Sequence, residues 1–227
     1  MSSDSAVKYH KKYVYSAENR PLLALIPKEA TRFLDVGCGT GALAAAIQRE
    51  HGWSHFEGIT YSEEEVQYAQ EIMHKVWFED LNTFDFAQLG MFDCIICSHV
   101  LEHLARPWDV LESLRSHIKQ DGALLVALPN ALELKTRIAF LKGRFRYVDS
   151  GILDRTHYRF FDWQTAFELV RDAGFEVDVR TATGFFPLPG IRRLIGGAGQ
   201  KLDVAMAKRF PGLFGVQFIL RGRRRSA

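Results

Sequence analysis

Short apolar runs alternate with segments of helical pattern along the chain, and this alternation predicts an α/β protein. The run Phe92 to Ser98 is apolar enough to lie buried in a parallel sheet. Good helix formers fill Ala42 to Ile47, and Leu111, Leu114 and Ile118 recur at helical spacing. The predicted strands are Phe33 to Val36, Phe56 to Ile59, Val76 to Phe78, Phe92 to Ser98, Ala123 to Leu128, Phe175 to Val179 and Val216 to Leu220. Strands that alternate with helices favour a mainly parallel sheet covered by helices on both faces.

Polar residues mark several predicted element ends. Ser62 precedes three glutamates, which predicts an N-cap with acids in the first helical turn. Asp162 predicts a second N-cap, for a helix that ends at Ala173-Gly174. The pair Asp121-Gly122 predicts a turn between the helix that contains Leu111 and the strand after it.

The length of 227 residues suits one domain, and no repeat, low-complexity tract or linker divides residues 1–227. At the amino terminus, Ala6 to Ala24 predicts a helix broken at Pro21, and residues 1–30 are expected to cover the sheet. Residues 131–161 form an insertion before the helix that Asp162 caps. Such an insertion is expected to roof the active site as a substrate lid.

Composition narrows the class of protein. Hydrophobic residues make up 47% and charged residues 25%, which excludes a disordered chain. No apolar run is long enough to span a bilayer, so a cytoplasmic enzyme is expected. The cysteines Cys38, Cys94 and Cys97 lie in apolar or glycine-rich segments and are expected to be reduced and buried. Because Cys94 and Cys97 are three apart on a strand, they should point to opposite faces and hold neither zinc nor a disulfide.

The net charge of +2 is unevenly distributed. From Gly184 to the end there are nine basic residues against one acid, Asp203. This basic end either faces an anionic substrate, a membrane surface or nucleic acid, or simply keeps the protein in solution.

The segment Asp35-Val36-Gly37-Cys38-Gly39-Thr40-Gly41 joins a predicted strand to a predicted helix. Glycine permits the positive φ of a tight turn, and it lets a ligand and the helix approach the backbone closely. The first turn of the helix offers unpaired N–H groups to an anionic ligand. A carboxylate at Asp35 is placed to accept a hydrogen bond from an amine or amide of that ligand.

This segment resembles the first motif of class I S-adenosylmethionine-dependent methyltransferases. Later segments recur in one branch of that family in the same order: Phe92-Asp93, Leu101-Glu102-His103, Leu128-Pro129-Asn130 and Asp154-Arg155-Thr156-His157-Tyr158-Arg159-Phe160-Phe161. That branch includes bacterial glycan-associated and ubiquinone-pathway O-methyltransferases. The resemblance implies a Rossmann-like sheet of order 3-2-1-4-5-7-6 with strand 7 antiparallel. It also implies that S-adenosylmethionine is bound by Asp35, Gly37, Cys38, Gly39, Thr60, Tyr61, Asp80, Leu81 and Ser98.

Thr60 departs from the family pattern, because an acid at this strand end usually binds the ribose hydroxyls. Methyltransferases of the fatty-acid-modifying kind have a similar Gly-Ile-Thr run, so methyltransferase activity is still expected. A hydroxyl binds ribose less strongly than a carboxylate does. A scaffold protein that keeps the fold with weak catalysis is therefore an alternative.

His99, Glu102 and His103 form the pattern HxxEH. A zinc peptidase requires this pattern on a long helix, and here it follows a buried strand. RNA 2′-O-methyltransferases and ubiquinone-pathway enzymes carry ExxEH at the matching place. The resemblance therefore implies a divalent metal, zinc, manganese or iron, held by His99, Glu102, His103 and His157. The alternative is that His157 or His99 is a metal-free general base.

In the insertion, Leu134, Ile138 and Leu141 recur at helical spacing beside several basic residues. Leu134 and Ile138 are expected to contribute to the core, and Gly143 and Gly151 are candidate hinges. The insertion resembles that of glycan-associated methyltransferases, which implies a sugar or lipid-linked glycan hydroxyl as the methyl acceptor. A quinone or catechol precursor is the main rival, an RNA 2′-hydroxyl is less favoured, and the basic stripe suggests contact with a membrane surface.

Overall fold

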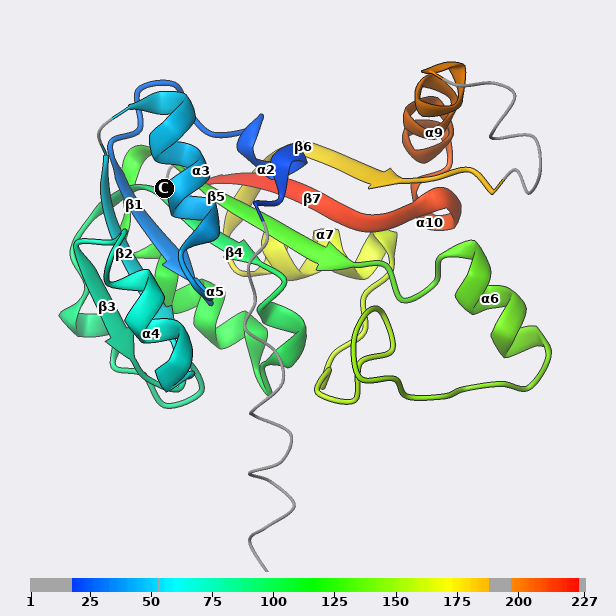
Figure 1. Cartoon of the computed structure of the whole chain (residues 1–227), viewed down its shortest axis with the longest axis horizontal. Helices are drawn as coiled ribbons and strands as arrows, with labels where there is room; N and C mark the ends of the chain where they lie inside the picture. Colours follow the sequence, from blue (N-terminus) through cyan, green and yellow to red (C-terminus); the bar gives the residue numbers. More distant parts are fainter. Residues whose placement is uncertain (1–17, 53, 188–196, 225–227) are drawn as a thin grey trace, which may run out of the picture.

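The computed structural model describes residues 18–52, 54–187 and 197–224, which form a layered α/β structure around one seven-stranded sheet (Figure 1). The strands are β1 Arg32–Val36, β2 His55–Thr60, β3 Lys75–Phe78, β4 Phe92–Ser98, β5 Ile118–Pro129, β6 Phe175–Gly184 and β7 Gly215–Arg224. Their order is β3-β2-β1-β4-β5-β7-β6. Strands β1 to β5 pair in parallel, whereas β7 is antiparallel to both β5 and β6. The predicted strand order and orientation are confirmed.

Helices cover both faces of this sheet (Figure 1). They are α2 Arg20–Leu23, α3 Ala42–His51, α4 Glu63–Ala69, α5 Pro107–Arg115, α6 Leu134–Leu141, α7 Trp163–Asp172, α9 Gly197–Arg209 and α10 Pro211–Phe214, with 3₁₀ turns at Phe86–Gln88 and Leu101–His103. Apolar residues of α2 and α3 form one buried cluster with one face of the sheet, and those of α5 and α7 form a second cluster with the other face.

Alternation along the buried strands divides their side chains between the two clusters. In β4, Cys94 and Ile96 belong to the cluster on the α3 side, whereas Ile95 and Cys97 belong to the cluster on the α7 side. The prediction that Cys94 and Cys97 point to opposite faces is thus confirmed. Cys38, Cys94 and Cys97 are all free and buried, and burial raises the pKa of each thiol.

Both predicted N-caps are present. The Ser62 hydroxyl accepts a hydrogen bond from the Glu65 N–H, and Asp162 forms a capping box with Thr165 at the start of α7. Pro21, by contrast, lies in the first turn of α2, where proline is tolerated, and so it begins this helix instead of breaking one. The rest of the helix predicted over Ala6 to Ala24, and most of the cover predicted for residues 1–30, lies outside the described residues.

The turn predicted at Asp121-Gly122 is wrong, because β5 begins at Ile118 and continues through both residues. Ile118 pairs with Phe92, and the register shifts between Phe92 and Cys94, so the extra strand residues form a bulge. A Cβ at Gly122 would lie 2.7 Å from Ile118 Cγ2 and 2.9 Å from the Asp93 carbonyl oxygen. The glycine is therefore required for close packing within a strand.

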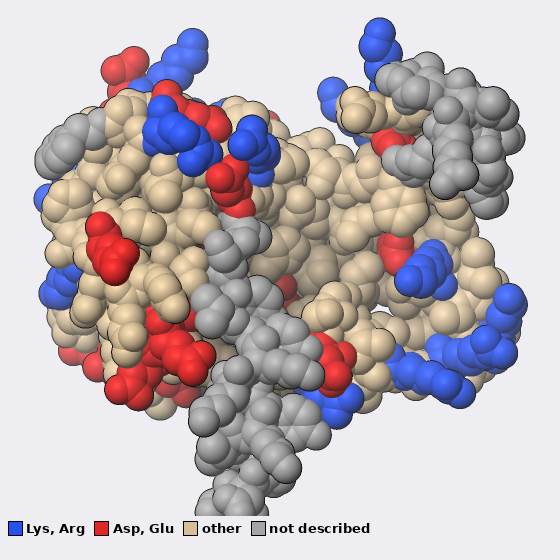
Figure 2. Space-filling model, viewed as in Figure 1, with Lys and Arg blue, Asp and Glu red and all other residues tan. Residues whose placement is uncertain are grey.

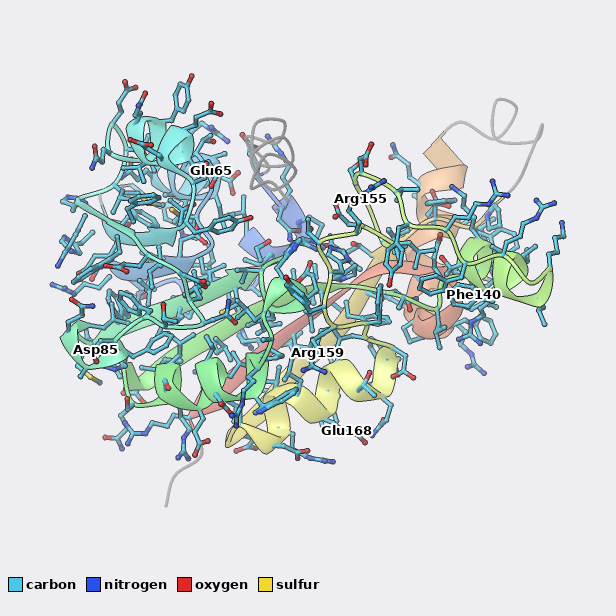
Figure 3. All side chains as sticks on the ribbon, turned by 90° about the horizontal axis from the view of Figure 1, so that it is seen from below. Glu65, Asp85, Phe140, Arg155, Arg159 and Glu168 are labelled. Carbon is cyan, nitrogen blue, oxygen red and sulfur yellow. The ribbon has the colours of Figure 1, made fainter. Side chains whose placement is uncertain are left out.

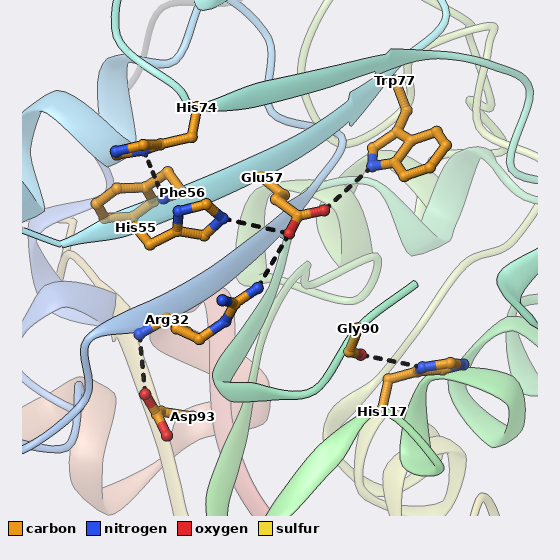
Figure 4. Close-up of polar contacts among 9 residues, drawn as sticks. All are labelled: Arg32, His55, Phe56, Glu57, His74, Trp77, Gly90, Asp93 and His117. Atoms are coloured by element: carbon orange, nitrogen blue, oxygen red, sulfur yellow. Dashed lines mark hydrogen bonds and ion pairs between the residues drawn. The ribbon is translucent and has the colours of Figure 1, made fainter. Parts of the chain in front are cut away.

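A polar network joins the amino-terminal halves of the first strands (Figure 4). Glu57, which is buried, accepts hydrogen bonds from Arg32 at 3.3 Å and from Trp77 Nε1 at 3.4 Å, and lies 3.3 Å from His55 Nε2. Asp93 accepts from the Arg32 N–H at 2.9 Å and pairs with Lys119. These contacts join strands β1 to β5 away from the carboxyl end of β1, where the glycine turn begins. Their role is therefore structural.

The insertion of residues 131–161 leaves and rejoins the domain at one place, because Asn130 and Phe161 form a parallel bridge. Within it, α6 projects from the body of the molecule (Figure 1). The expectation that its apolar stripe contributes to the core is wrong: Ile138 is 43% exposed, and the buried residue of α6 is Thr136.

Two further features bear on where the chain acts. Among the described residues, no helix combines the length and the apolar character that crossing a membrane requires. Part of the basic carboxyl end is neutralised within the fold, since Arg221 and Arg223 pair with Asp178 at 2.9 Å and 2.8 Å.

Candidate functional site

The glycine turn follows β1 as predicted and has the backbone that only glycine adopts readily. Gly37, Gly39 and Gly41 have φ values of 77°, 55° and 80°. The N–H groups of Gly37 and Cys38 both donate to the Ile59 carbonyl oxygen, which ties the turn to β2. A Cβ at Gly37 would lie 2.6 Å from Val100, so the turn also packs against the segment after β4.

Asp35 lies inside the sheet just before this turn, and its side chain is 3% exposed. Burial raises the pKa of Asp35 to about 7. A carboxyl group held in this way becomes a strong partner for a cation, because binding one offsets the cost of ionising it. Asp35 is therefore suited to the ammonium group of an amino-acid moiety.

A second buried carboxylate, which sequence reasoning missed, lies at the end of β2. The Thr60 hydroxyl donates to Glu65 Oε2 at 2.6 Å, and both side chains are buried. The charges of Asp35 and Glu65 both add to the effect of burial in raising the Cys38 pKa, so both acids lie near the glycine turn. The sequence contains one indication that Glu65 lies near Thr60. Glu65 is the third residue after the Ser62 cap, at the helix end nearest Thr60.

The other predicted cofactor residues lie around the same strand ends. Asp80 is exposed after β3, where Oδ1 accepts from the N–H and the amide of Asn82, and Leu81 is buried beside it. The pKa of the Tyr61 hydroxyl is raised by partial burial, then by Glu65, Asp80 and, from the insertion, Asp154. Tyr61, which follows β2, therefore lies within electrostatic reach of the end of β3 and of the insertion. Ser98, at the end of β4, accepts from Asn19 Nδ2 at 2.9 Å.

Three of the four predicted metal ligands come together. One ring nitrogen each of His103 and His157 and a carboxylate oxygen of Glu102 all lie within 4.8 Å of one another. Glu102 is 1% exposed, and its Oε2 has no hydrogen-bond partner among the described residues. Two N–H groups, of Tyr158 and Arg159, donate to the Glu102 carbonyl oxygen and so hold the segment that carries His157 against Glu102.

Backbone carbonyls orient the two rings of this cluster. Nδ1 of His157 lies 3.1 Å from the Ile152 carbonyl oxygen, and Nδ1 of His103 lies 3.3 Å from that of Thr156. A carbonyl only accepts, so each Nδ1 carries the hydrogen and each Nε2 keeps its lone pair. Burial lowers the pKa of His157, and His103 adds to this effect while Glu102 opposes it.

His99 contacts this group through Glu102 but is not one of the three residues that come together, so its role as a fourth ligand stays a prediction. Its Nε2 lies 2.7 Å from Gln217 Oε1 and its Nδ1 lies 3.4 Å from Glu102 Oε1, so both ring nitrogens are engaged. Burial favours the neutral ring, but the hydrogen bond and charge of Glu102, with Gln217, raise the net pKa of His99. Its φ of 54° is rare for a residue with a side chain, and such strain concentrates at functional sites.

A cavity of about 280 Å³ lies between the insertion and the start of α7. Its walls include Leu132, Phe140, Phe145, Leu153, Phe160 and Phe161. Aromatic contacts lead from it toward the histidines: ring centroids are 6.2 Å apart for Phe145 and Phe160, 6.3 Å for Phe160 and His157, and 4.6 Å for His157 and His103. Figure 3 shows Phe140 in α6 and Glu65 in α4 toward opposite ends of the molecule, with Arg155 of the insertion between them.

Comparisons with known proteins agree with this architecture. The ubiquinone biosynthesis O-methyltransferase of Thiobacillus denitrificans is 26% identical over 191 residues, which cover 81% of this chain and 80% of that protein. The enzyme of the same name from Rickettsia prowazekii is 25% identical, and the match covers 64% of this chain and 59% of that protein. A crystal structure of a SAM-dependent methyltransferase from Archaeoglobus fulgidus superposes with a TM-score of 0.62 at 19% identity, over 90% of both chains.

The family described as a methyltransferase domain matches residues 9–179, which is well over half of the chain. This range contains the glycine turn, Glu65, and the Glu102, His103 and His157 cluster. The protein belongs to this methyltransferase domain family and is an S-adenosylmethionine-dependent methyltransferase.

Proposed function

We propose that this methyltransferase transfers the methyl group to a hydroxyl oxygen placed beside Glu102, His103 and His157. The observation that carries the proposal is this cluster of two oriented imidazoles and a buried carboxylate at the end of β4, next to the glycine turn. S-adenosylmethionine, when bound, supplies the electrophilic methyl group. The names of the relatives from Thiobacillus and Rickettsia, as O-methyltransferases, support oxygen as the acceptor atom.

The residues around the glycine turn fit the cofactor. Asp35 is the partner for the ammonium group of its methionine moiety, because it is a carboxyl group whose pKa burial raises, and a cation bound beside it would offset the cost of ionising it. The Thr60 and Glu65 pair supplies a hydroxyl and a carboxylate where the family usually has one acid, so these two residues bind the ribose hydroxyls. Asp80 and Leu81 are placed for the adenine ring.

Glu102, His103 and His157 fit a divalent metal. Glu102 Oε2 is buried without a hydrogen-bond partner in the described chain, and this is the atom that a cation would satisfy. Two imidazoles and one carboxylate suit zinc, manganese or iron better than magnesium. A bound metal would lower the pKa of the acceptor hydroxyl.

The protein's own contribution is to orient groups and to handle one proton. The lone pair of His157 Nε2, which would hold the metal when one is bound, is otherwise free to take the proton of the acceptor hydroxyl, and the Ile152 carbonyl fixes the ring through Nδ1. His99 and Gln217 hold Glu102 in place from its other oxygen. Backbone hydrogen bonds hold the segment that carries His157 against Glu102, and methyl transfer needs little beyond the alignment of the two reacting atoms.

The acceptor that we favour is an aromatic diol of the catechol or quinol type. The cavity is lined by aromatic and aliphatic side chains, among them Phe160, whose ring centroid is 6.3 Å from that of His157, and this lining suits an aromatic ring or an apolar substituent. The relatives' names refer to ubiquinone biosynthesis, which supports the same class. The sugar or lipid-linked glycan expected from the insertion sequence is the competing class, because aromatic rings also stack on sugars.

A panel of acceptors tests this proposal. Purified protein is incubated with S-adenosylmethionine and, separately, with an alkyl-substituted catechol, a methyl glycoside and a short RNA, and the products are identified by mass spectrometry. Transfer of one methyl group to a catechol oxygen, lost in His157→Ala, is the expected result. Transfer to the glycoside alone would replace the acceptor class, and methylation at nitrogen or carbon would overturn the proposal.

A further inference from the structure

The insertion exposes large apolar side chains on its outer surface. Leu141, at the end of α6, is 88% exposed, and Phe145, Tyr147 and Val148 in the loop after it are each about half exposed. Ile138 lies one helical turn before Leu141. We call these five residues the lid face. Contiguous apolar surface of this kind marks an interaction site.

The charged residues of the same segment are all basic. Lys135, Arg137, Lys142, Arg144 and Arg146 lie within it, and no acid lies between Glu133 and Asp149. Figure 2 shows Lys and Arg side chains gathered over α6 at the lower right of the molecule. Arg137 donates to the carbonyls of Leu132 and Gly212, and so it anchors α6 to α10. The other four are exposed.

Aromatic contacts within this segment hold its side chains in place. Phe140 stacks on Phe145 with ring centroids 5.4 Å apart, and Phe145 meets Tyr147 edge to face at 5.2 Å. Phe140 and Phe145 also line the cavity between the insertion and α7. The segment therefore presents a formed surface.

We propose that the lid face docks on the surface of an anionic lipid bilayer. Charge complementarity commits the proposal to this partner, because lysines and arginines beside exposed leucine and aromatic side chains suit the boundary between headgroups and acyl chains. Nucleic acid would satisfy the positive charge, but it would gain little from Ile138, Leu141 and Val148, which have no π-face for bases. The inference goes beyond methyl transfer, since docking requires neither cofactor nor acceptor.

Vesicle sedimentation tests the proposal with the full-length protein. We expect the protein to sediment with vesicles of equal phosphatidylcholine and phosphatidylglycerol, to bind them less at high salt, and to bind pure phosphatidylcholine weakly. The same result is expected with or without S-adenosylmethionine. Binding to a short RNA of equal strength that competes with the vesicles would instead identify a nucleic-acid surface and overturn the proposal.

Variants separate the lid face from charge elsewhere in the molecule. Each basic residue near an anionic surface strengthens binding about fivefold, so Lys142→Gln with Arg144→Gln should weaken it about 25-fold. The matched control is Lys28→Gln with Lys75→Gln, two exposed cations remote from α6. Equal losses in the two double variants would mean that net charge alone drives adsorption, and would overturn the proposal.

The apolar part of the surface has its own pair of variants. Leu141→Ala should weaken vesicle binding about tenfold, because an inserted leucine buries its side chain in the bilayer boundary. Tyr68→Ala removes another exposed large side chain, from α4 outside the lid face, and should change nothing. An unchanged dissociation constant for S-adenosylmethionine in each variant shows that the fold is intact. If Leu141→Ala binds vesicles as the parent does, the lid face does not insert and the proposal fails.

Discussion

His99 and Gln217 lie 118 positions apart in sequence, yet His99 Nε2 and Gln217 Oε1 are separated by 2.7 Å. The amide of Gln217 also donates to Thr183 Oγ1 at 2.9 Å and to Asn19 Oδ1 at 3.2 Å. One side chain on β7 therefore ties β6 and the amino-terminal segment to the histidine that contacts Glu102. Because β7 is inserted antiparallel between β5 and β6, it brings this amide to the end of β4, which ends at Ser98 just before His99.

Replacement of Gln217 tests this arrangement. In Gln217→Leu, His99, Asn19 and Thr183 lose partners, so the free energy of unfolding should fall by about 1–3 kcal/mol in urea titrations. The value of kcat should fall about tenfold or more, since groups that orient an active-site shell typically have effects of this size. Thr183→Val removes one contact of Gln217 but leaves the His99 hydrogen bond, and it should keep near-normal kcat. Equal losses of kcat in the two variants would show that β7 acts only through stability.

The Asp35 carboxyl group should lower the stability of the cofactor-free protein and strengthen the binding of the cofactor. Its pKa is raised by burial to about 7, so between about pH 4 and about pH 7 the unfolded chain loses this proton while the native protein keeps it. The cofactor-free protein is therefore destabilised as pH rises through this window. Asp35→Asn removes the effect, and its gain in Tm over the parent should be larger at about pH 8 than at about pH 5.

The same variant should lose about tenfold to 100-fold in affinity for S-adenosylmethionine, because the ammonium group loses its charged partner. Calorimetric titration measures the affinity, and thermal melts of the cofactor-free protein measure the stability. Asp121→Asn, which changes an exposed carboxyl, should affect neither quantity. A pH-independent gain in Tm for Asp35→Asn would contradict the raised pKa.

The sequence predicted the sheet well because its central strands β1, β2 and β4 are buried on both faces and read as apolar runs. Ile118 was misplaced because one isoleucine fits a helical stripe and a strand equally well, and only its pairing with Phe92 decides between them. The Ile138 stripe was assigned to the core because periodicity shows that a helix has an apolar face but does not show what lies opposite it. In both cases the deciding contact is distant in sequence.

The sequence predicted only part of the candidate site, again because some deciding contacts are distant in sequence. Motif residues close in sequence, such as Glu102 and His103, were found together, and His157 joined them through the resemblance. Gln217 has no local pattern that marks it, since it lies within an ordinary strand. Glu65 is one of three consecutive glutamates, and only the direction of α4 shows that it alone turns inward to Thr60 while Glu63 and Glu64 remain exposed.

Loss of the proposed metal should follow from changes at its three ligands. Glu102→Gln and His157→Ala should each abolish stoichiometric zinc, manganese or iron in elemental analysis and lower kcat at least 100-fold, with S-adenosylmethionine binding unchanged. Chelator treatment of the parent should have the same effect, reversed by adding the metal. His117→Ala is the matched control, because that ring also contacts a backbone carbonyl through Nδ1, of Gly90, away from the site (Figure 4). Full activity without metal, but none in His157→Ala, would identify His157 as a base that acts alone.

Glu65 should replace the missing acid at Thr60 in binding the cofactor ribose. Its carboxylate accepts a hydrogen bond from the Thr60 hydroxyl, with the two oxygens 2.6 Å apart, and lies near the glycine turn, so Glu65→Gln should weaken binding of S-adenosylhomocysteine and of adenosine about tenfold. Glu64→Gln removes an equal charge from the exposed face of the same helical turn and should leave both affinities unchanged, which separates a direct contact from the general field of α4. Adenosine is the informative ligand because it carries the ribose but no amino-acid moiety, so the Asp35 contact does not contribute to its affinity. If Glu65→Gln binds adenosine as tightly as the parent does, Glu65 only fixes the Thr60 rotamer, and the threonine alone serves the ribose.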